Sequence, residues 1–456
     1  MKRHFIGIGG IGISALAKYY LEKGHQVSGS DLVSSEITEA LKKSGAKIYI
    51  GKHTPKNLLK DVDLVIYSPA VQKNNPELLK AYKLKTTNYK LQVMSYPEAL
   101  GELTKKYFTI AVSGMHGKST TTAMIGLLLV KAGFDPTVIV GTKLKEFGDS
   151  NCRVGKSRYL VIEADEHMAS FLNYWPKIIV LTNIEKDHLD YYKNLKNILK
   201  TFRKYISHLP KDGILVANWN DKNIRWILNP KSKIQNPKKN QKPKSKILKY
   251  FLKQREAKKL RRILKVPGDY NVSNALAALA VARILKIPDK VSFKALSEYK
   301  GAWRRFEIKY TNLHKSEHKS TRITIINDYA HHPTEIEATL MAAREKYPRK
   351  KIWCIFQPHQ YQRTFYLFKD FIKVLGRVPI DKLIITDIFD VAGRENKEKK
   401  RKVSSKKLIK AIKKPWIIYL SKNKILSYLK KNLKNGEVVI IMGAGDIYKL
   451  SEKFKV

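Results

Sequence analysis

The feature that most constrains the fold of this chain is a glycine-rich turn between an apolar strand and a helix. Residues 107–113 (YFTIAVS) have the composition of a buried strand, and residues 118–133 (KSTTTAMIGLLLVKAG) have the length of a helix. A strand that runs through such a turn directly into a helix is typical of parallel α/β sheets. The sequence therefore predicts stacked α/β layers.

This turn also carries the strongest chemical signal in the chain. Backbone N–H groups and a helix N-terminus form an anion site there, Lys118 can reach terminal phosphates, and the Ser119 hydroxyl can ligate Mg²⁺. The P-loop pattern usually has glycine at the position of Val112, so a glycine-rich turn with an incidental lysine remains the alternative. The motif consists of Gly114, Met115, His116, Gly117, Lys118, Ser119 and Thr120.

Short β-branched runs and longer helical stretches alternate through the rest of the 456 residues. That length is too great for one hydrophobic core, so several domains are expected. We predict a Rossmann-like N-terminal domain over residues 1–98, a central P-loop domain over 99–301 and a Rossmann-like C-terminal domain over 302–456.

A second glycine-rich turn follows the first predicted strand. Residues 7–12 (GIGGIG) contain the GxGxxG spacing, and Asp31 closes the second predicted strand. In a Rossmann-like domain this arrangement binds the diphosphate of a nucleotide at a helix N-terminus. Close packing of a helix on a strand also requires such glycines, so the spacing alone is weak evidence.

Hard metal ligands follow two predicted strands of the central domain. Glu163 ends the strand RYLVIE, and His188 follows the strand KIIVLT within the segment NIEKDH. A carboxylate, an imidazole and the Ser119 hydroxyl near a triphosphate would form a Mg²⁺ shell, although imidazole is not the usual ligand of magnesium. Each residue alone could equally be a cap or turn group.

The chain is strongly basic, with 89 Lys or Arg residues against 39 Asp or Glu residues and a formal net charge of +50. Residues 229–265 hold 15 of the basic residues and one acid, Glu256. This lysine-rich insertion or loop could contact nucleic acid or another polyanion, whereas the diffuse remainder is typical of a solvated surface. We expect a loop in its first half and a basic amphipathic helix over residues 246–265.

Cysteine and apolar content indicate the compartment. The two cysteines, Cys152 and Cys354, cannot make a framework of disulfides, and no apolar run approaches the roughly 18 residues that span a bilayer. We expect a cytoplasmic protein without membrane insertion.

Taken in order, these motifs resemble the Mur ligases of peptidoglycan synthesis. The resemblance extends from residue 4 to residue 447. The matching segments are HFIGIGGIGISALA, SGSD, YSPAVQKNNPE, AVSGMHGKSTTTAM, VIEADE, LTNIEKDHLDYY, NVSNALAALAVA, RRFE, NDYAHHPTEI, FQPHQYQRT and MGAGDI.

The resemblance implies a three-domain enzyme that uses ATP and Mg²⁺ to ligate an amino acid to a sugar carboxylate through an acyl phosphate. The opening GIGGIGIS and the segment DYAHHPTE favour the member that joins L-alanine to UDP-N-acetylmuramate. A monomer or homodimer is expected, with no functional need for nucleic acid.

The resemblance also implies roles for single residues. ATP would contact the seven residues of the glycine-rich motif together with Asn274 at the adenine, Arg305 at the γ-phosphate and Asp328 at the ribose. The metal ligands would be Ser119, Glu163 and His188, and the sugar nucleotide would contact Gly9, Gly10, Gly12, Asp31 and Ser68. Tyr329, His331 and Arg363 would face the reaction centre or the alanine, and the residues that carry catalysis would be Lys118, Glu163, His188, His331 and Arg363.

Three positions depart from the family pattern. Met168 stands in place of aspartate, Tyr270 in place of histidine and Gln360 in place of arginine, and the segment over residues 219–267 is shorter than usual.

Two other functions therefore stay open. One is a ligase that attaches another amino acid or a recycled peptide to the same sugar acid, and the other is a decayed ATPase with a polyanion-binding surface. His331 is a candidate base for the amine, and the neighbouring His332 could equally be structural.

Overall fold

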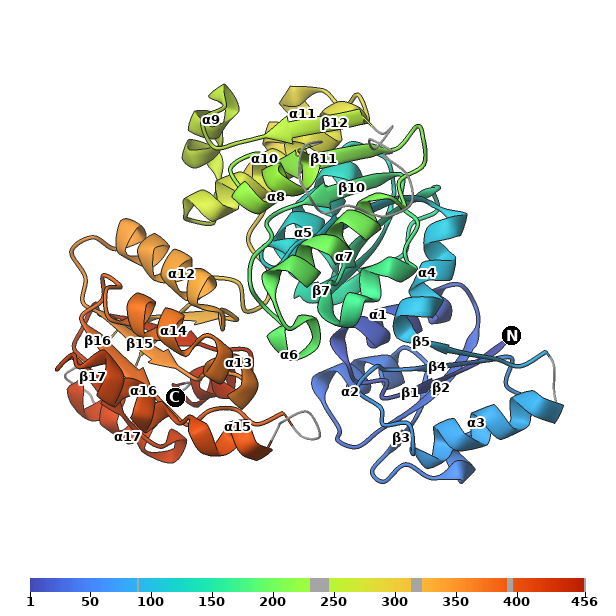
Figure 1. Cartoon of the computed structure of the whole chain (residues 1–456), viewed down its shortest axis with the longest axis horizontal. Coiled ribbons are helices and arrows are strands. Elements are labelled where there is room, and N and C mark those ends of the chain that lie inside the picture. The colour runs from blue at the N-terminus through green and yellow to red at the C-terminus, as the bar shows by residue number, and fades with distance from the viewer. Residues whose placement is uncertain (88–89, 230–245, 313–321, 392–396, 455–456) are drawn as a thin grey trace. The chain divides into compact units, whose positions relative to one another are not determined.

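The computed structural model describes residues 1–87, 90–229, 246–312, 322–391 and 397–454. These residues form three β-sheets with helices packed against them, which can be followed in Figure 1 by their labels. The predicted α/β class with three layered sheets is confirmed, and the domain boundaries stay predictions. The chain divides into two compact units, of which the first comprises Met1–Ile184, Leu199–Phe251 and Asn274–Leu296, and the second Glu185–Ile198, Leu252–Ser273 and Ser297–Val456.

The first sheet has five parallel strands in the order β3-β2-β1-β4-β5. This order reverses between β1 and β4, which is where a Rossmann-like sheet binds its ligand. Helix α1 ends before Gly24, whose φ of +78° suits glycine at a helix C-terminus. The elements are β1 Lys2–Ile6, α1 Ile11–Glu22, β2 Gln26–Asp31, α2 Glu36–Lys43, β3 Lys47–Ile50, β4 Leu64–Tyr67, α3 Pro76–Thr87, β5 Gln92–Ser95 and α4 Tyr96–Lys106.

The second sheet has seven strands in the order β12-β11-β10-β6-β9-β7-β8. Strand β6 lies between β10 and β9 and is buried, because helices cover both faces of a parallel sheet. The glycine-rich motif therefore follows a central strand. The elements are β6 Phe108–Ser113, α5 Lys118–Lys131, β7 Thr137–Leu144, β8 Ser150–Arg153, β9 Tyr159–Ala164, β10 Ile178–Leu181, α7 Leu195–Ile206, β11 Ile214–Asn218, α8 Lys222–Leu228, β12 Lys246–Tyr250, α10 Asp269–Ile284 and α11 Asp289–Glu298.

The prediction of one helix over residues 246–265 is wrong in its first part. Strand β12 pairs in parallel with β11, and the helix is confined to α9, Arg255–Ile263. Sheet pairing outweighs helical spacing here, because Tyr250 is buried at the end of β12 and its hydroxyl donates to the Leu181 carbonyl at 3.1 Å. The predicted loop over residues 230–245 lies outside the described residues.

The third sheet has six strands in the order β13-β14-β18-β15-β16-β17, with β13 antiparallel to β14. Its unit also contains the segment Glu185–Ile198, with α6 Leu189–Tyr192, which comes from between β10 and β11 in the sequence. No helix of the described segments has the length and apolar composition needed to cross a membrane. The elements are β13 Glu307–Asn312, β14 Arg322–Asp328, α12 Pro333–Lys346, β15 Ile352–Phe356, α13 Tyr361–Tyr366, α14 Phe368–Leu375, β16 Lys382–Ile385, α15 Lys397–Lys402, α16 Ser405–Ile412, β17 Ile417–Tyr419, α17 Lys422–Asn432 and β18 Val438–Met442.

Candidate active site

The glycine-rich motif forms a tight loop that ends at the N-terminus of α5. Gly114 and Gly117 have φ angles of +140° and +82°, which only glycine adopts at little cost. A Cβ on Gly114 would lie 2.1 Å from Thr182 Oγ1, so there is no room for a side chain at this position. The loop therefore directs the first N–H groups of a 14-residue helix toward one point, as an anion site requires.

The neighbouring strand β10 holds this loop through two polar side chains at its end. The His116 N–H donates to Asn183 Oδ1 at 2.9 Å, and Asn183 Nδ2 donates to the His116 carbonyl at 2.9 Å. Thr182 Oγ1 donates to the same carbonyl at 2.7 Å. Sequence reasoning assigned no role to these two residues, although their position after an apolar strand beside the motif was a usable signal.

Lys118 is held at the mouth of the loop. Its Nζ donates to the Gly114 carbonyl at 2.7 Å and to Glu166 Oε2 at 2.8 Å, and Asp165 Oδ1 lies 3.9 Å away. Burial would lower the Lys118 pKa, but the carboxylates of Glu166 and Asp165 outweigh it and hold that pKa above its ordinary value. The ammonium is therefore charged and directed toward the phosphate loop.

Asn274 of α10 lies against the glycine loop and the first turn of α5. A Cβ on Gly117 would lie 2.5 Å from Asn274 Oδ1, and Thr121 Oγ1 donates to that oxygen at 3.1 Å. The predicted contact of Asn274 with adenine stays a prediction, because its described partners belong to the loop and to α5.

Two of the predicted metal ligands lie in this unit. Ser119 is buried in the first turn of α5, and Glu163 stands at the end of β9 opposite Val112 of β6. Glu163 Oε2 accepts the Gly141 N–H at 2.8 Å, and a Cβ on Gly141 would lie 2.2 Å from that oxygen. A hydroxyl and an anchored carboxylate suit a hard cation such as Mg²⁺. His188 belongs to the other unit.

The second glycine-rich loop converges with Asp31 and Ser68 at the carboxyl edge of the first sheet. The Gly9 N–H donates to Asp31 Oδ2 at 2.8 Å, and a Cβ on Gly7 would lie 3.1 Å from the Ser68 Cβ. Gly10 is the N-cap residue of α1. A Cβ added to Gly12 would lie 3.0 Å from the nearest atom of the Tyr96 ring. These residues come together as predicted, and their contact with a sugar nucleotide stays a prediction.

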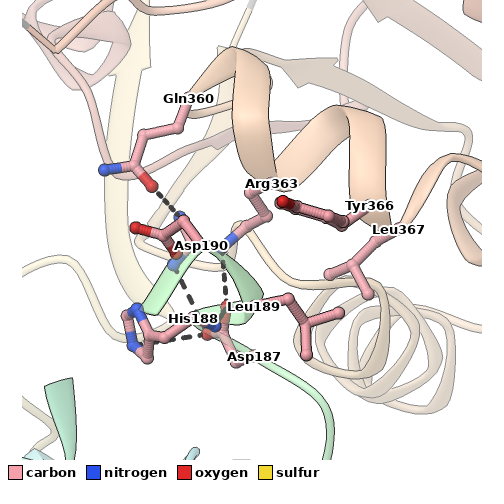
Figure 2. Close-up of a pocket in the computed structure, with 8 residues that line it drawn as sticks. All are labelled: Asp187, His188, Leu189, Asp190, Gln360, Arg363, Tyr366 and Leu367. Carbon is pink, nitrogen blue, oxygen red and sulfur yellow. Dashed lines mark hydrogen bonds and ion pairs between the residues drawn. The ribbon is translucent and has the colours of Figure 1, made fainter. Parts of the chain in front are cut away.

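The second unit contains a pocket between the segment around His188 and helix α13, drawn in Figure 2. Figure 2 shows the Arg363 guanidinium directed at the Asp187 carboxylate, which also lies beside His188. The pocket is lined by Asp187, His188, Leu189, Asp190, Gln360, Arg363, Tyr366 and Leu367.

Arg363 and Asp187 form a buried ion pair across 176 residues of sequence. Arg363 Nε lies 3.1 Å from Asp187 Oδ1, and both side chains are 6% exposed. Burial would raise the Asp187 pKa, but Arg363 and the nearby histidines outweigh it and hold that pKa well below its ordinary value. Sequence reasoning missed Asp187, and its place beside His188 was the only signal.

Asp328 ends β14 beside the turn that carries Arg305. Its carboxylate accepts the N–H groups of Phe306 and Ala330, both at 2.8 Å. Burial nevertheless raises the Asp328 pKa to about 6. The Arg305 guanidinium lies 4.6 Å from the centre of the Tyr329 ring, so three residues predicted from the resemblance come together. Buried Arg304, to which no role was assigned, donates to the carbonyls of Gly443 and Gly445.

His331 follows this group on the same loop. Its Nδ1 lies 3.0 Å from the Tyr329 carbonyl and 3.3 Å from Glu335 Oε2. Burial lowers the His331 pKa to about 3, against the opposing effect of Glu335. The ring is therefore neutral at pH 7 and a poor proton acceptor. His332 instead caps α12, and its Nε2 lies 3.0 Å from the Lys186 carbonyl.

The three departures from the family pattern lie in different surroundings. Met168 is 49% exposed and has a φ of +53°. Tyr270 packs against the core of the third sheet. Gln360 has a φ of +70°, and its Oε1 accepts from Arg363 Nη1 at 3.3 Å. Of the three, Gln360 lines the pocket and contacts Arg363 there.

Comparison with known proteins relates this architecture to one family. Three family profiles match in succession, the Mur ligase family catalytic domain over residues 2–108, the Mur ligase middle domain over residues 112–282 and the Mur ligase glutamate ligase domain over residues 304–445. Together they cover most of the chain.

Individual relatives match over nearly their full length. The chain is 41% identical to a UDP-N-acetylmuramate–L-alanine ligase of Clostridium acetobutylicum, covering 99% of this chain and 97% of the relative. It is 42% identical to a ligase of the same name from Clostridium botulinum, covering 99% and 96%. The crystal structure of UDP-N-acetylmuramate–alanine ligase from Thermotoga maritima has a TM-score of 0.76 at 28% identity, covering 100% and 98%. The chain belongs to the Mur ligase family.

Proposed function

We propose that this chain joins L-alanine to the carboxylate of UDP-N-acetylmuramate at the expense of ATP. The observation that carries the proposal is the Lys118 ammonium, held at the mouth of a glycine loop that opens onto the N-terminus of α5. The full-length similarity to relatives of that activity supports it and selects the substrates.

The first chemical step activates a carboxylate that an amine cannot otherwise displace. A carboxylate oxygen of the sugar acid attacks the γ-phosphorus of ATP, a new O–P bond forms, and the bond to ADP breaks. Lys118 and the first N–H groups of α5 neutralise the charge on the transferred phosphoryl group. Glu166 holds the lysine charged and oriented before ATP binds.

The cation would be held by Ser119 and Glu163, and His188 would be the third protein ligand. Mg²⁺ supplies charge neutralisation on the phosphates and a template for the reacting oxygens. Asn183 holds the glycine loop that carries Ser119, and the Gly141 N–H holds the Glu163 carboxylate.

The second step forms the amide. The neutral α-amine of alanine attacks the acyl carbon, a C–N bond forms, and phosphate leaves with the electron pair of the C–O bond. Arg363 is the cation proposed to face the alanine carboxylate, because its guanidinium is fixed in the pocket of the second unit. With a pKa of about 3, His331 would accept a hydrogen bond from the amine, and a stronger base such as the departing phosphate would take its proton.

Phosphate release in purified enzyme tests this proposal. With ATP, Mg²⁺ and UDP-N-acetylmuramate, we expect release to require L-alanine and to fall at least tenfold with glycine, L-serine or the tripeptide of recycled peptidoglycan. Mass spectrometry should identify UDP-N-acetylmuramoyl-L-alanine as the product. Faster release with the tripeptide would identify a peptide-recycling ligase instead. ATP hydrolysis without either acceptor, and without any amide product, would indicate a decayed ATPase.

A further inference from the structure

Asp187 has no role in the reaction described so far, yet its buried carboxylate contacts both Arg363 and His188. Its side chain is buried, at 6% exposed. Oδ1 accepts from Arg363 Nε at 3.1 Å and from the His188 N–H at 2.7 Å, and Oδ2 accepts from Arg363 Nη2 at 3.4 Å. One carboxylate thus contacts two residues with proposed functions.

For Arg363, the carboxylate fixes the plane of the guanidinium. A two-point contact between a guanidinium and a carboxylate sets orientation as well as distance. The remaining nitrogen, Nη1, lies 3.3 Å from Gln360 Oε1 and 3.4 Å from His359 Nδ1. Without Asp187, the guanidinium would keep, among the described residues, these contacts to Gln360 and His359 and no hydrogen bond to a carboxylate.

For His188, the same carboxylate stabilises an uncommon backbone conformation. His188 has φ and ψ angles of +50° and +40°, the left-handed region, which costs a residue with a side chain roughly 1–2 kcal/mol. Its N–H is held by Asp187, and its carbonyl accepts from Tyr191 and Tyr192 at 3.0 and 2.9 Å. These bonds set the direction in which the imidazole leaves the backbone.

We infer that Asp187 is a positioning residue that couples the cation ligand His188 to the amino-acid-facing Arg363. The inference rests on the proposed function, which assigns His188 to Mg²⁺ and Arg363 to alanine. Because one carboxylate orients both side chains, its loss weakens Mg²⁺ and alanine binding together. A purely structural ion pair would instead change stability alone.

The test is Asp187→Asn, with Asp381→Asn as its matched control. Asp381 also accepts from an arginine, Arg344 at 2.7 Å, and from a backbone N–H, that of Ile352 at 2.9 Å, outside the pocket. In Asp187→Asn we expect the Mg²⁺ concentration for half-maximal rate and the KM for alanine each to rise roughly tenfold or more, with the KM for ATP within twofold. Asp381→Asn should keep all three values.

Metal binding is also measured without turnover. Mn²⁺ titrated in the presence of ADP and followed by electron paramagnetic resonance should bind Asp187→Asn more weakly than wild type. If Asp187→Asn does not fold, the double variant Asp187→Asn/Arg363→Gln carries the test, since it leaves no buried arginine without a partner. Against Arg363→Gln alone, the double variant should bind Mn²⁺ more weakly and show no further rise in the KM for alanine.

Unchanged Mg²⁺, Mn²⁺ and alanine constants, with a lower Tm, would overturn the inference and leave Asp187 as a structural residue. Weakening of the metal constants alone would overturn the coupling. Failure of the wild-type enzyme to use alanine would refute the proposed function instead, and Mn²⁺ binding would still test Asp187.

Discussion

The two units of this protein hold their functional cations in different ways. Lys118 is fixed by a local motif, because its Nζ binds the Gly114 carbonyl four residues away and the two glycines of the loop set the turn. Arg363 is fixed by Asp187, 176 residues distant in the sequence. The first arrangement combines backbone shape with an ion pair to the buried Glu166, whereas the second rests on the ion pair to Asp187, so they should respond differently to mutation.

The largest effect is expected where the local motif loses its charge. Lys118→Ala should lower kcat by roughly 10³-fold, as does the loss of other groups that stabilise a developing anion. The variant should still fold but with a lower Tm, because it removes an ion-pair partner from the Glu166 carboxylate, which is only 1% exposed. Phosphate release and thermal unfolding measure the two quantities. Turnover within tenfold of wild type would refute the role of Lys118.

Backbone shape is tested by Gly117→Ala, with Gly133→Ala as its control. Both glycines have φ near +80°, but an added Cβ meets Asn274 Oδ1 at 2.5 Å in the first and nothing within 4 Å in the second. Both variants should lose about 1 kcal/mol of stability from backbone strain, and Gly117→Ala should lose more, because its Cβ meets Asn274 Oδ1. Only Gly117→Ala should also weaken ATP binding, by roughly 10–100-fold in Kd. Equal ATP affinity in the two variants would show that the loop tolerates a side chain.

A smaller effect on the rate is expected at Glu163, whose carboxylate accepts the Gly141 N–H. Glu163→Gln keeps an oxygen for the Gly141 N–H but removes the charge that a cation requires, so the Mg²⁺ concentration for half-maximal rate should rise roughly tenfold. His188→Ala should slow the reaction as well. If both variants titrate with Mg²⁺ as wild type does, the proposed ligand set is wrong.

The features that the sequence predicted are set by local residues, and the features that it missed are set by contacts between residues remote in the sequence. The α/β class, the strand ends at Asp31 and Glu163 and the phosphate loop were predictable, because glycine positions and apolar runs act locally. Strand β12 was missed because lysines flank its apolar residues, and only pairing with β11 decides its conformation. Asp187 was missed because its partner Arg363 is remote in sequence, and no pattern of spacing reports such a pair.

The smallest effect is a pH dependence of stability in the second unit. His331 has a pKa of about 3 in the folded protein against about 6.5 when unfolded, so the unfolded state binds the extra proton first. The contribution of the neutral ring is complete above pH 6.5 and is lost as pH falls toward 3, by up to roughly 1.4 kcal/mol for each pH unit. Wild type should therefore lose more stability between pH 7.5 and pH 5.5 than His331→Gln, which has no such proton to bind. Urea unfolding of both proteins at the two pH values measures the difference, which should be about 1 kcal/mol. An equal loss in both would show that His331 is protonated without cost in the folded unit, and that the acid sensitivity lies in other groups.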